Sequence, residues 1–263
     1  MHRRAMQRTR GHTMATEARR YGRAIERQDG RDFPFYDGDP IRIPAWQWVT
    51  IVVACVAAIT VLSFYPAADN IQSLVPRFLF TAIMLAVLIA FTRRHWARIF
   101  QRTTARDFGT MIVFAILSLI VSFTVGIIVK AIFGTNANTA ADGIHGAGEI
   151  VAFYVGTAIQ LLGEELFTIL PFLAVMALCH RIGLTRTQGI LIAWLATAIW
   201  FGAAHLPTYG WNFAQALLII GVARLVLTLA YIRTKNIAVS TGAHIINDWV
   251  LFTAAIIGAT ASA

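Results

Sequence analysis

Long runs of apolar residues, separated by short polar connectors, follow one another from Trp46 to the C-terminal end of the chain. A helix needs roughly 20 apolar residues to cross the hydrocarbon of a bilayer. Runs of about that length lie at residues 46–65, 74–92, 108–133, 149–179, 188–204, 213–232 and 236–258. The pattern therefore predicts an all-α, polytopic membrane protein, with about seven transmembrane helices in one domain at 46–263.

The fourth run is too long for one straight crossing of the bilayer. It contains Pro171, a residue that bends helices because it lacks a backbone N–H. We expect this helix either to bend at Pro171 or to begin outside the hydrocarbon.

Composition supports lipid as the solvent, since 57% of residues are hydrophobic and only 13% are charged. This excludes an ordinary water-soluble domain and makes membrane lipids an expected partner. The net charge of +9 resides in arginines of the N-terminal segment and of the connectors, so we do not expect nucleic-acid binding. Cys55 and Cys179 lie in apolar runs and imply no disulfide framework.

Residues 1–45 hold ten arginines and six acidic residues without an apolar period, which predicts a basic, disordered tail. Lysine and arginine concentrate in cytoplasmic loops of membrane proteins. The connectors that contain them are 93–107, 180–187 and 233–235; those without any are 66–73, 134–148 and 205–212. This alternation predicts a cytoplasmic N-terminus in a multi-pass protein, which we expect in the plasma membrane.

Ionisable side chains within the predicted spans are the candidates for chemistry, because each costs roughly 3 kcal/mol or more in hydrocarbon. Glu164 and Glu165 are adjacent and would point about 100° apart on a helix. One carboxylate can then act as a base while its neighbour makes a structural contact. Arg224 lies in the middle of the sixth span, whereas Lys130 ends the third and is expected to reach the interface.

Two histidines accompany these carboxylates in the later spans. Phe201 and His205 are one helical turn apart, and His244 and Asp248 share a helix face with Asn247 beside them. A single membrane histidine more often bonds two helices together, but this combination is typical of a proton-transfer site. His205 and His244 differ in expected depth, so their helices must be tilted or shortened for the imidazoles to meet.

These motifs resemble those of the CPBP intramembrane proteases, a family of CAAX-processing and bacteriocin-processing members often described as glutamic proteases. The family pattern is Glu-Glu-x-x-x-Arg, then Phe-x-x-x-His, then His-x-x-x-Asn/Asp, in successive helices. The resemblance covers a core of about residues 145–255, with the matching residues Glu164, Glu165, Phe201, His205, His244 and Asp248.

The resemblance implies an intramembrane endopeptidase that cuts a membrane-associated or lipidated peptide or protein. Glu164 and His205 would polarise a water for attack on the peptide carbonyl. His244, with Asp248 or Asn247, would stabilise the oxyanion or hold the water. No metal or other cofactor is implied.

One position departs from the family pattern. The motif arginine would stand at position 169, where this chain has Ile169, so Glu165 lacks its local cation. As a hypothesis from that gap, Arg224 reaches across from a neighbouring helix and neutralises Glu165.

Three other interpretations remain open from the sequence. Glu164, His205 and His244 would also form a two-histidine, one-carboxylate zinc site, although the His-Glu-x-x-His spacing of zinc proteases is absent. A proton-coupled transporter also buries such groups, and it predicts flux without cleavage. The replaced arginine fits a catalytically inactive scaffold or immunity protein of the same family.

Overall fold

The computed structural model describes residues 25–27, 29–142, 144 and 146–261. All regular secondary structure in this part is helical. The long helices are α2 (Ala45–Phe64), α3 (Leu74–Thr92), α4 (Ala105–Phe133), α5 (Gly146–Arg181), α6 (Arg186–Ala204), α7 (Gly221–Thr234) and α8 (Ile237–Ala261). A 3-10 helix, η1 (Arg93–Ile99), follows α3, and a π-helical turn, η2 (Gln215–Ile220), leads into α7. The predicted all-α bundle is confirmed.

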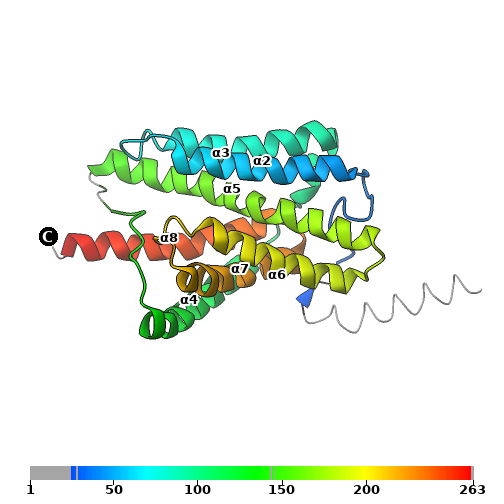
Figure 1. Cartoon of the computed structure of the whole chain (residues 1–263). Helices are drawn as coiled ribbons and strands as arrows, with labels where there is room; N and C mark the ends of the chain where they lie inside the picture. The colour runs from blue at the N-terminus through cyan, green and yellow to red at the C-terminus, as the bar shows by residue number, and fades with distance from the viewer. Residues whose placement is uncertain (1–24, 28, 143, 145, 262–263) are drawn as a thin grey trace, which may run out of the picture.

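The helices agree with the predicted spans to within a few residues at each end. Six helical segments of the described chain are long and apolar enough to cross a membrane, with η2 and α7 joined as one of them. Helix α8 is outside this set, although its 25 residues are long enough to cross the hydrocarbon. Helix α2 begins at one end of the bundle and α8 ends at the other, which suits an odd number of crossings (Figure 1).

Helix α5 is the centre of the bundle. It packs against α2 and α3 on one side and α6 and α8 on the other, while α4 lies at the edge beside α7 and α8 (Figure 1). Its 36 residues run through Pro171 as one helix. At about 1.5 Å per residue the helix is about 54 Å long, so it is tilted or extends beyond the roughly 30 Å of hydrocarbon.

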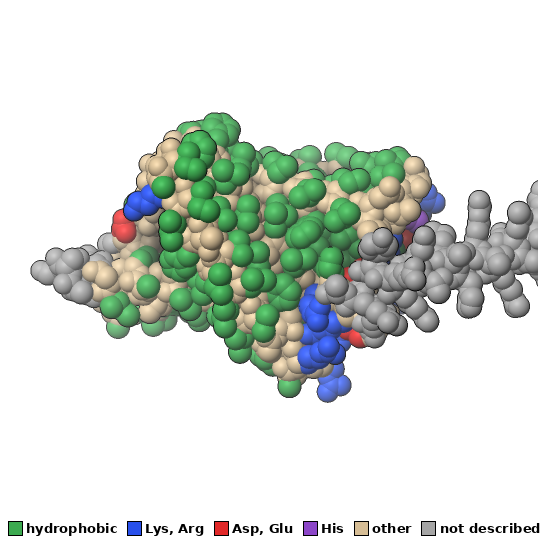
Figure 2. All heavy atoms as spheres, turned by 90° about the horizontal axis from the view of Figure 1, so that it is seen from below, with side chains coloured by type: hydrophobic (Ala, Val, Ile, Leu, Met, Phe, Trp, Pro, Cys, Tyr) green, Lys and Arg blue, Asp and Glu red, His purple; other side chains and the backbone are tan. Residues whose placement is uncertain are grey.

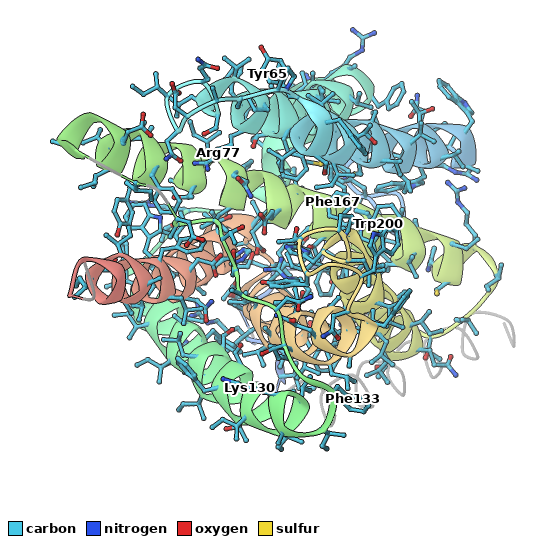
Figure 3. The ribbon with its side chains drawn as sticks, turned by 60° about the vertical axis from the view of Figure 1, so that its left-hand side comes forward. Tyr65, Arg77, Lys130, Phe133, Phe167 and Trp200 are labelled. Atoms are coloured by element: carbon cyan, nitrogen blue, oxygen red, sulfur yellow. The ribbon has the colours of Figure 1, made fainter. Side chains whose placement is uncertain are left out.

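The outer surface is apolar, as lipid contact requires. Large exposed side chains such as Val53, Phe78, Ile120 and Ile127 project from α2, α3 and α4. Figure 2 shows apolar side chains across the middle of one face, with lysine and arginine side chains towards its edges and both ends. Lys130 is exposed near the end of α4, in the position expected for a side chain that reaches the interface (Figure 3).

The described part of the N-terminal segment differs from the disordered tail predicted for residues 1–45. Phe33 and Phe35 are each only 2% exposed, and the Phe33 ring lies 5.5 Å from Phe172 and 5.7 Å from Tyr231. Burial of these two aromatic side chains holds the segment against the bundle. Residues 1–24 and 28 lie outside the described residues.

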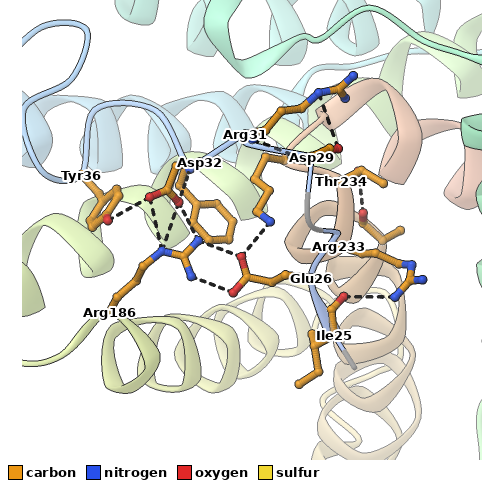
Figure 4. A network of polar contacts seen from close by, with 12 residues as sticks. Ile25, Glu26, Asp29, Arg31, Asp32, Tyr36, Arg186, Arg233 and Thr234 are labelled. Carbon is orange, nitrogen blue, oxygen red and sulfur yellow. Dashed lines mark hydrogen bonds and ion pairs between the residues drawn. The ribbon is translucent and has the colours of Figure 1, made fainter. Parts of the chain in front are cut away.

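A polar network ties the same segment to two of the basic connectors. Both carboxylate oxygens of Glu26 accept from Arg186 at 2.7 Å, and Lys235 Nζ lies 2.7 Å from Glu26 Oε2 (Figure 4). Asp32 pairs with Arg186 at 2.5 Å. Connectors predicted to share the cytoplasmic side therefore meet at one end of the bundle.

This network should make stability depend on pH. Burial raises the pKa of Glu26, but hydrogen bonds and positive charge from Arg186 and Lys235 outweigh it and hold the pKa below its ordinary value. The contribution of Glu26 is then complete above its ordinary pKa of about 4.3 and is lost as pH falls through the lower folded value. Thermal unfolding in detergent should show wild type above Glu26→Gln at pH 7, with the difference shrinking below about pH 4.

Asp29→Asn is the control for that measurement, because Asp29 is exposed and its carboxylate accepts from the backbone N–H of Arg31 at 3.2 Å and lies 3.7 Å from the Arg31 side chain. Its unfolding temperature should match wild type at both pH values. A Glu26→Gln protein as stable as wild type at pH 7 would contradict the stabilising role of the network.

Candidate active site

The two adjacent glutamates of α5 point to different surroundings, as the helical geometry predicted. Glu165 is completely buried, and its Oε1 lies 2.7 Å from Arg224 Nη1 and 3.1 Å from His244 Nδ1. Glu164 is 8% exposed and lies on a cavity wall, where Gln160 Nε2 donates to its Oε1 at 2.8 Å. Glu165 is therefore held in a buried ion pair, and Glu164 is the carboxylate of the two that faces the cavity.

Arg224 supplies the cation that Glu165 lacks on its own helix. It is fully buried on α7, donates to Thr168 Oγ1 at 3.1 Å and lies 4.3 Å above the ring of Phe201. The ion pair hypothesised from the sequence is present. Ile169, at the position of the motif arginine, is fully buried in the apolar core instead.

His244 connects this buried pair to the cavity. Its Nδ1 lies 3.1 Å from both Glu165 Oε1 and Arg224 Nη2. Its Nε2 lies 3.8 Å from Glu164 Oε2 and 3.6 Å from Asp248 Oδ2. Nδ1 faces both an acceptor, Glu165, and a donor, Arg224, whereas both groups near Nε2 are carboxylates, which accept hydrogen bonds when ionised, so a proton on Nε2 fits this placement.

His205 takes its orientation from the end of α6. The backbone N–H of His205 donates to Gly202 O, and Nδ1 of its side chain lies 2.8 Å from Phe201 O. A carbonyl oxygen only accepts, so Nδ1 carries the proton, and Nε2 of a neutral ring has the free lone pair. The centre of the Phe201 ring lies 4.5 Å from that of His205 and 6.3 Å from that of His244, so this ring is beside both imidazoles.

Packing between α5 and α6 fixes the position of Phe201. The neighbouring Trp200 stacks on Phe167 at 5.0 Å, and its Nε1 donates to Phe167 O at 3.1 Å (Figure 3). This aromatic contact and hydrogen bond hold the two helices in register one turn from the site.

Asn247 and Asp248 form a pair on α8. Asn247 Nδ2 donates to Asp248 Oδ1 at 2.8 Å, while Asn247 Oδ1 is buried without a hydrogen-bond partner among the described residues. Asp248 thus accepts from Asn247 and faces the imidazole of His244. Asn247, an amide with N–H donors, suits the role of oxyanion donor better than an ionised Asp248.

These side chains surround one cavity of about 460 Å³ inside the bundle. The predicted site residues on its wall are Glu164, Phe201, His205, Arg224, His244, Asn247 and Asp248. The imidazoles therefore share one cavity despite their different expected depths, and Glu165 lies behind the wall. Gln160 and Arg77 also line it. Gln160 could have been found from the sequence, because it precedes Glu164 by four residues and so lies on the same helix face. No motif indicated Arg77.

Zinc coordination would need three of these groups around one point. Among the described residues, no group of three or more His, Cys, Asp and Glu side chains is arranged to hold a metal ion. The arrangement does support acid–base chemistry, because a carboxylate, two imidazoles and an amide line the same cavity.

The fold and this site define a multi-pass helical membrane protein with a cavity between its helices that is lined by ionisable side chains. Residues 146–250 match the family described as type II CAAX prenyl endopeptidase Rce1-like. This stretch contains α5 to α7 and the site residues of α8, and the match confirms the resemblance predicted from the motifs. It supports a function of the membrane-protease type. Comparisons with curated proteins and with solved structures gave no match.

Proposed function

We propose that this protein is an intramembrane endopeptidase that hydrolyses a peptide bond of a membrane-associated or lipidated peptide or protein. The placement of Glu164 carries the proposal. One oxygen is fixed by Gln160, and the other faces His244 Nε2 across 3.8 Å in the cavity that His205 also lines. That gap is too long for a direct hydrogen bond, and a water can bridge it.

In the proposed reaction this water gives a proton to Glu164 and its oxygen attacks the peptide carbonyl carbon. The lone pair on His205 Nε2 accepts the second hydrogen of the water and orients it. His244 Nε2–H and the amide of Asn247 donate to the developing oxyanion. When the tetrahedral intermediate collapses, the C–N bond breaks and Glu164 returns its proton to the leaving amine.

Each buried neighbour has a positioning role in this scheme. Glu165 and Arg224 hold the Nδ1 side of His244, so that its Nε2 points towards the attacked carbonyl. Asp248 accepts from Asn247 and orients its amide. No step requires a metal ion, and we propose metal-independent chemistry.

Proteolysis in reconstituted vesicles tests the proposal. A library of acylated peptides is incubated with wild type, with Glu164→Gln and with Glu149→Gln, a control on the same helix that lies outside the cavity. Glu164→Gln should reduce cleavage by about 10²–10⁴-fold. Glu149→Gln should cleave like wild type.

Other outcomes separate the remaining functions. A Glu164→Gln protein that cleaves as fast as wild type removes the proposed base. Activity that is lost with a chelator and restored by zinc would assign a zinc mechanism. Solute flux without cleavage would indicate a transporter, and neither cleavage nor flux would indicate an inactive scaffold.

A further inference from the structure

Two arginines, Arg77 and Arg224, line the cavity, and they differ in whether a carboxylate neutralises their charge. Arg224 is paired with Glu165 at 2.7 Å. Arg77, in the first turn of α3, has no ion pair with any carboxylate in the part of the chain that the structure describes. A cation inside a membrane protein generally faces a partner, an aqueous cavity or a substrate.

The contacts of Arg77 direct its guanidinium to the cavity wall formed by α5. It donates to Phe153 O at 3.3 Å and lies 5.6 Å from the centre of the Phe153 ring (Figure 3). A Cβ atom at Gly156 would lie only 2.6 Å from Arg77 Nη1. The absence of a side chain at Gly156 thus leaves space for the guanidinium, which reaches inward rather than along the lipid-facing surface.

The position of Arg77 can be measured along α5 from the proposed base. Gly156 and Glu164 are eight residues apart, and both Arg77 and Glu164 line the same cavity. Eight residues of helix correspond to about 12 Å. An extended peptide covers that distance with about three or four residues.

We propose that Arg77 is a specificity-determining residue that binds a carboxylate of the peptide substrate, three or four residues from the bond that is cut. This inference rests on the proposed peptidase function. A guanidinium binds a carboxylate through two parallel N–H···O bonds, which fixes both the position and the direction of the peptide. The carboxylate is supplied either by the C-terminus of the substrate or by an acidic side chain.

Peptide binding tests this separately from cleavage. The Glu164→Gln protein in phosphatidylcholine nanodiscs is titrated with three N-palmitoylated, fluorescent ten-residue peptides of one apolar sequence. The first ends in a free carboxylate, the second in an amide, and the third in an amide with glutamate as its last residue. The free acid should bind about tenfold or more tightly than the plain amide.

The third peptide identifies the source of the carboxylate. If it binds like the free acid, Arg77 accepts an acidic side chain; if it binds like the plain amide, Arg77 selects the C-terminus. Either result supports the proposal, provided that the preference depends on Arg77.

Arg77 variants test that dependence in the same Glu164→Gln protein. Arg77→Gln should bind all three peptides equally, and Arg77→Lys should retain part of the preference because it keeps the charge. Arg98→Gln removes an exposed arginine of η1 outside the cavity and should keep the full preference. Three results would overturn the inference. The Glu164→Gln protein could bind all three peptides equally, it could fail to bind the free acid, or the preference could persist in the Arg77→Gln variant. Cleavage by the protein with Glu164 intact separately decides the proposed function.

Discussion

Arg224→Leu is expected to destabilise the folded protein by about 3–5 kcal/mol, because it leaves the carboxylate of Glu165 buried without its cation. Both side chains are completely inaccessible, and their 2.7 Å contact joins α5 to α7. When Arg224 is removed, Glu165 remains as a buried charge without a partner, and this lowers the free energy of unfolding. Denaturant unfolding in detergent, followed by tryptophan fluorescence, measures the loss.

The double variant Arg224→Leu/Glu165→Leu separates charge from packing. It removes both charges, so it should recover a large part of the lost stability. His244 would still lose its neighbours on the Nδ1 side, and we expect the double variant to cleave slowly even when it is folded. An Arg224→Leu protein with the stability and activity of wild type would show that the pair has neither role.

His205→Ala is expected to reduce kcat/KM by about 10²–10⁴-fold with little change in stability. The described contacts of this side chain are a hydrogen bond to Phe201 O within its own turn and a ring contact with Phe201. Few packing contacts are therefore lost, whereas the free lone pair on Nε2 is removed from the cavity.

Peptide cleavage and thermal unfolding, measured on the same preparation, test this separation. His180→Ala is the control, because His180 is an exposed residue near the end of α5 and lies outside the cavity. It should retain activity. If His205→Ala were as active as wild type, the water would have to be held by Glu164 and His244 without this imidazole.

The bundle was predictable because each crossing of a bilayer requires a long apolar segment, and that requirement is visible in the residue order. The local part of the site was predictable for the same kind of reason. Glu164 and Glu165 are adjacent on one helix, and His244 and Asp248 are one turn apart, so helical geometry fixes how they diverge or converge.

Contacts between distant segments were predictable only where the sequence showed that a side chain lacked its expected partner. Ile169 at the motif position implied a missing cation, and this directed attention to Arg224. Arg77 gave no such signal, because its place beside Gly156 depends on how α3 packs against α5. The docked N-terminal segment was missed because arginines dominate its composition, although Phe33 and Phe35 mark apolar positions within it.

That docked segment also constrains the order in which the molecule is completed. Glu26 is 160 residues before Arg186, and its other partner, Lys235, lies in the connector before the final helix. All residues between Glu26 and Lys235 must be synthesised before Glu26 can meet both cations. The segment around Glu26 therefore takes its final place only after the helices up to α7 have been made, and its contacts then hold two connectors of the bundle together.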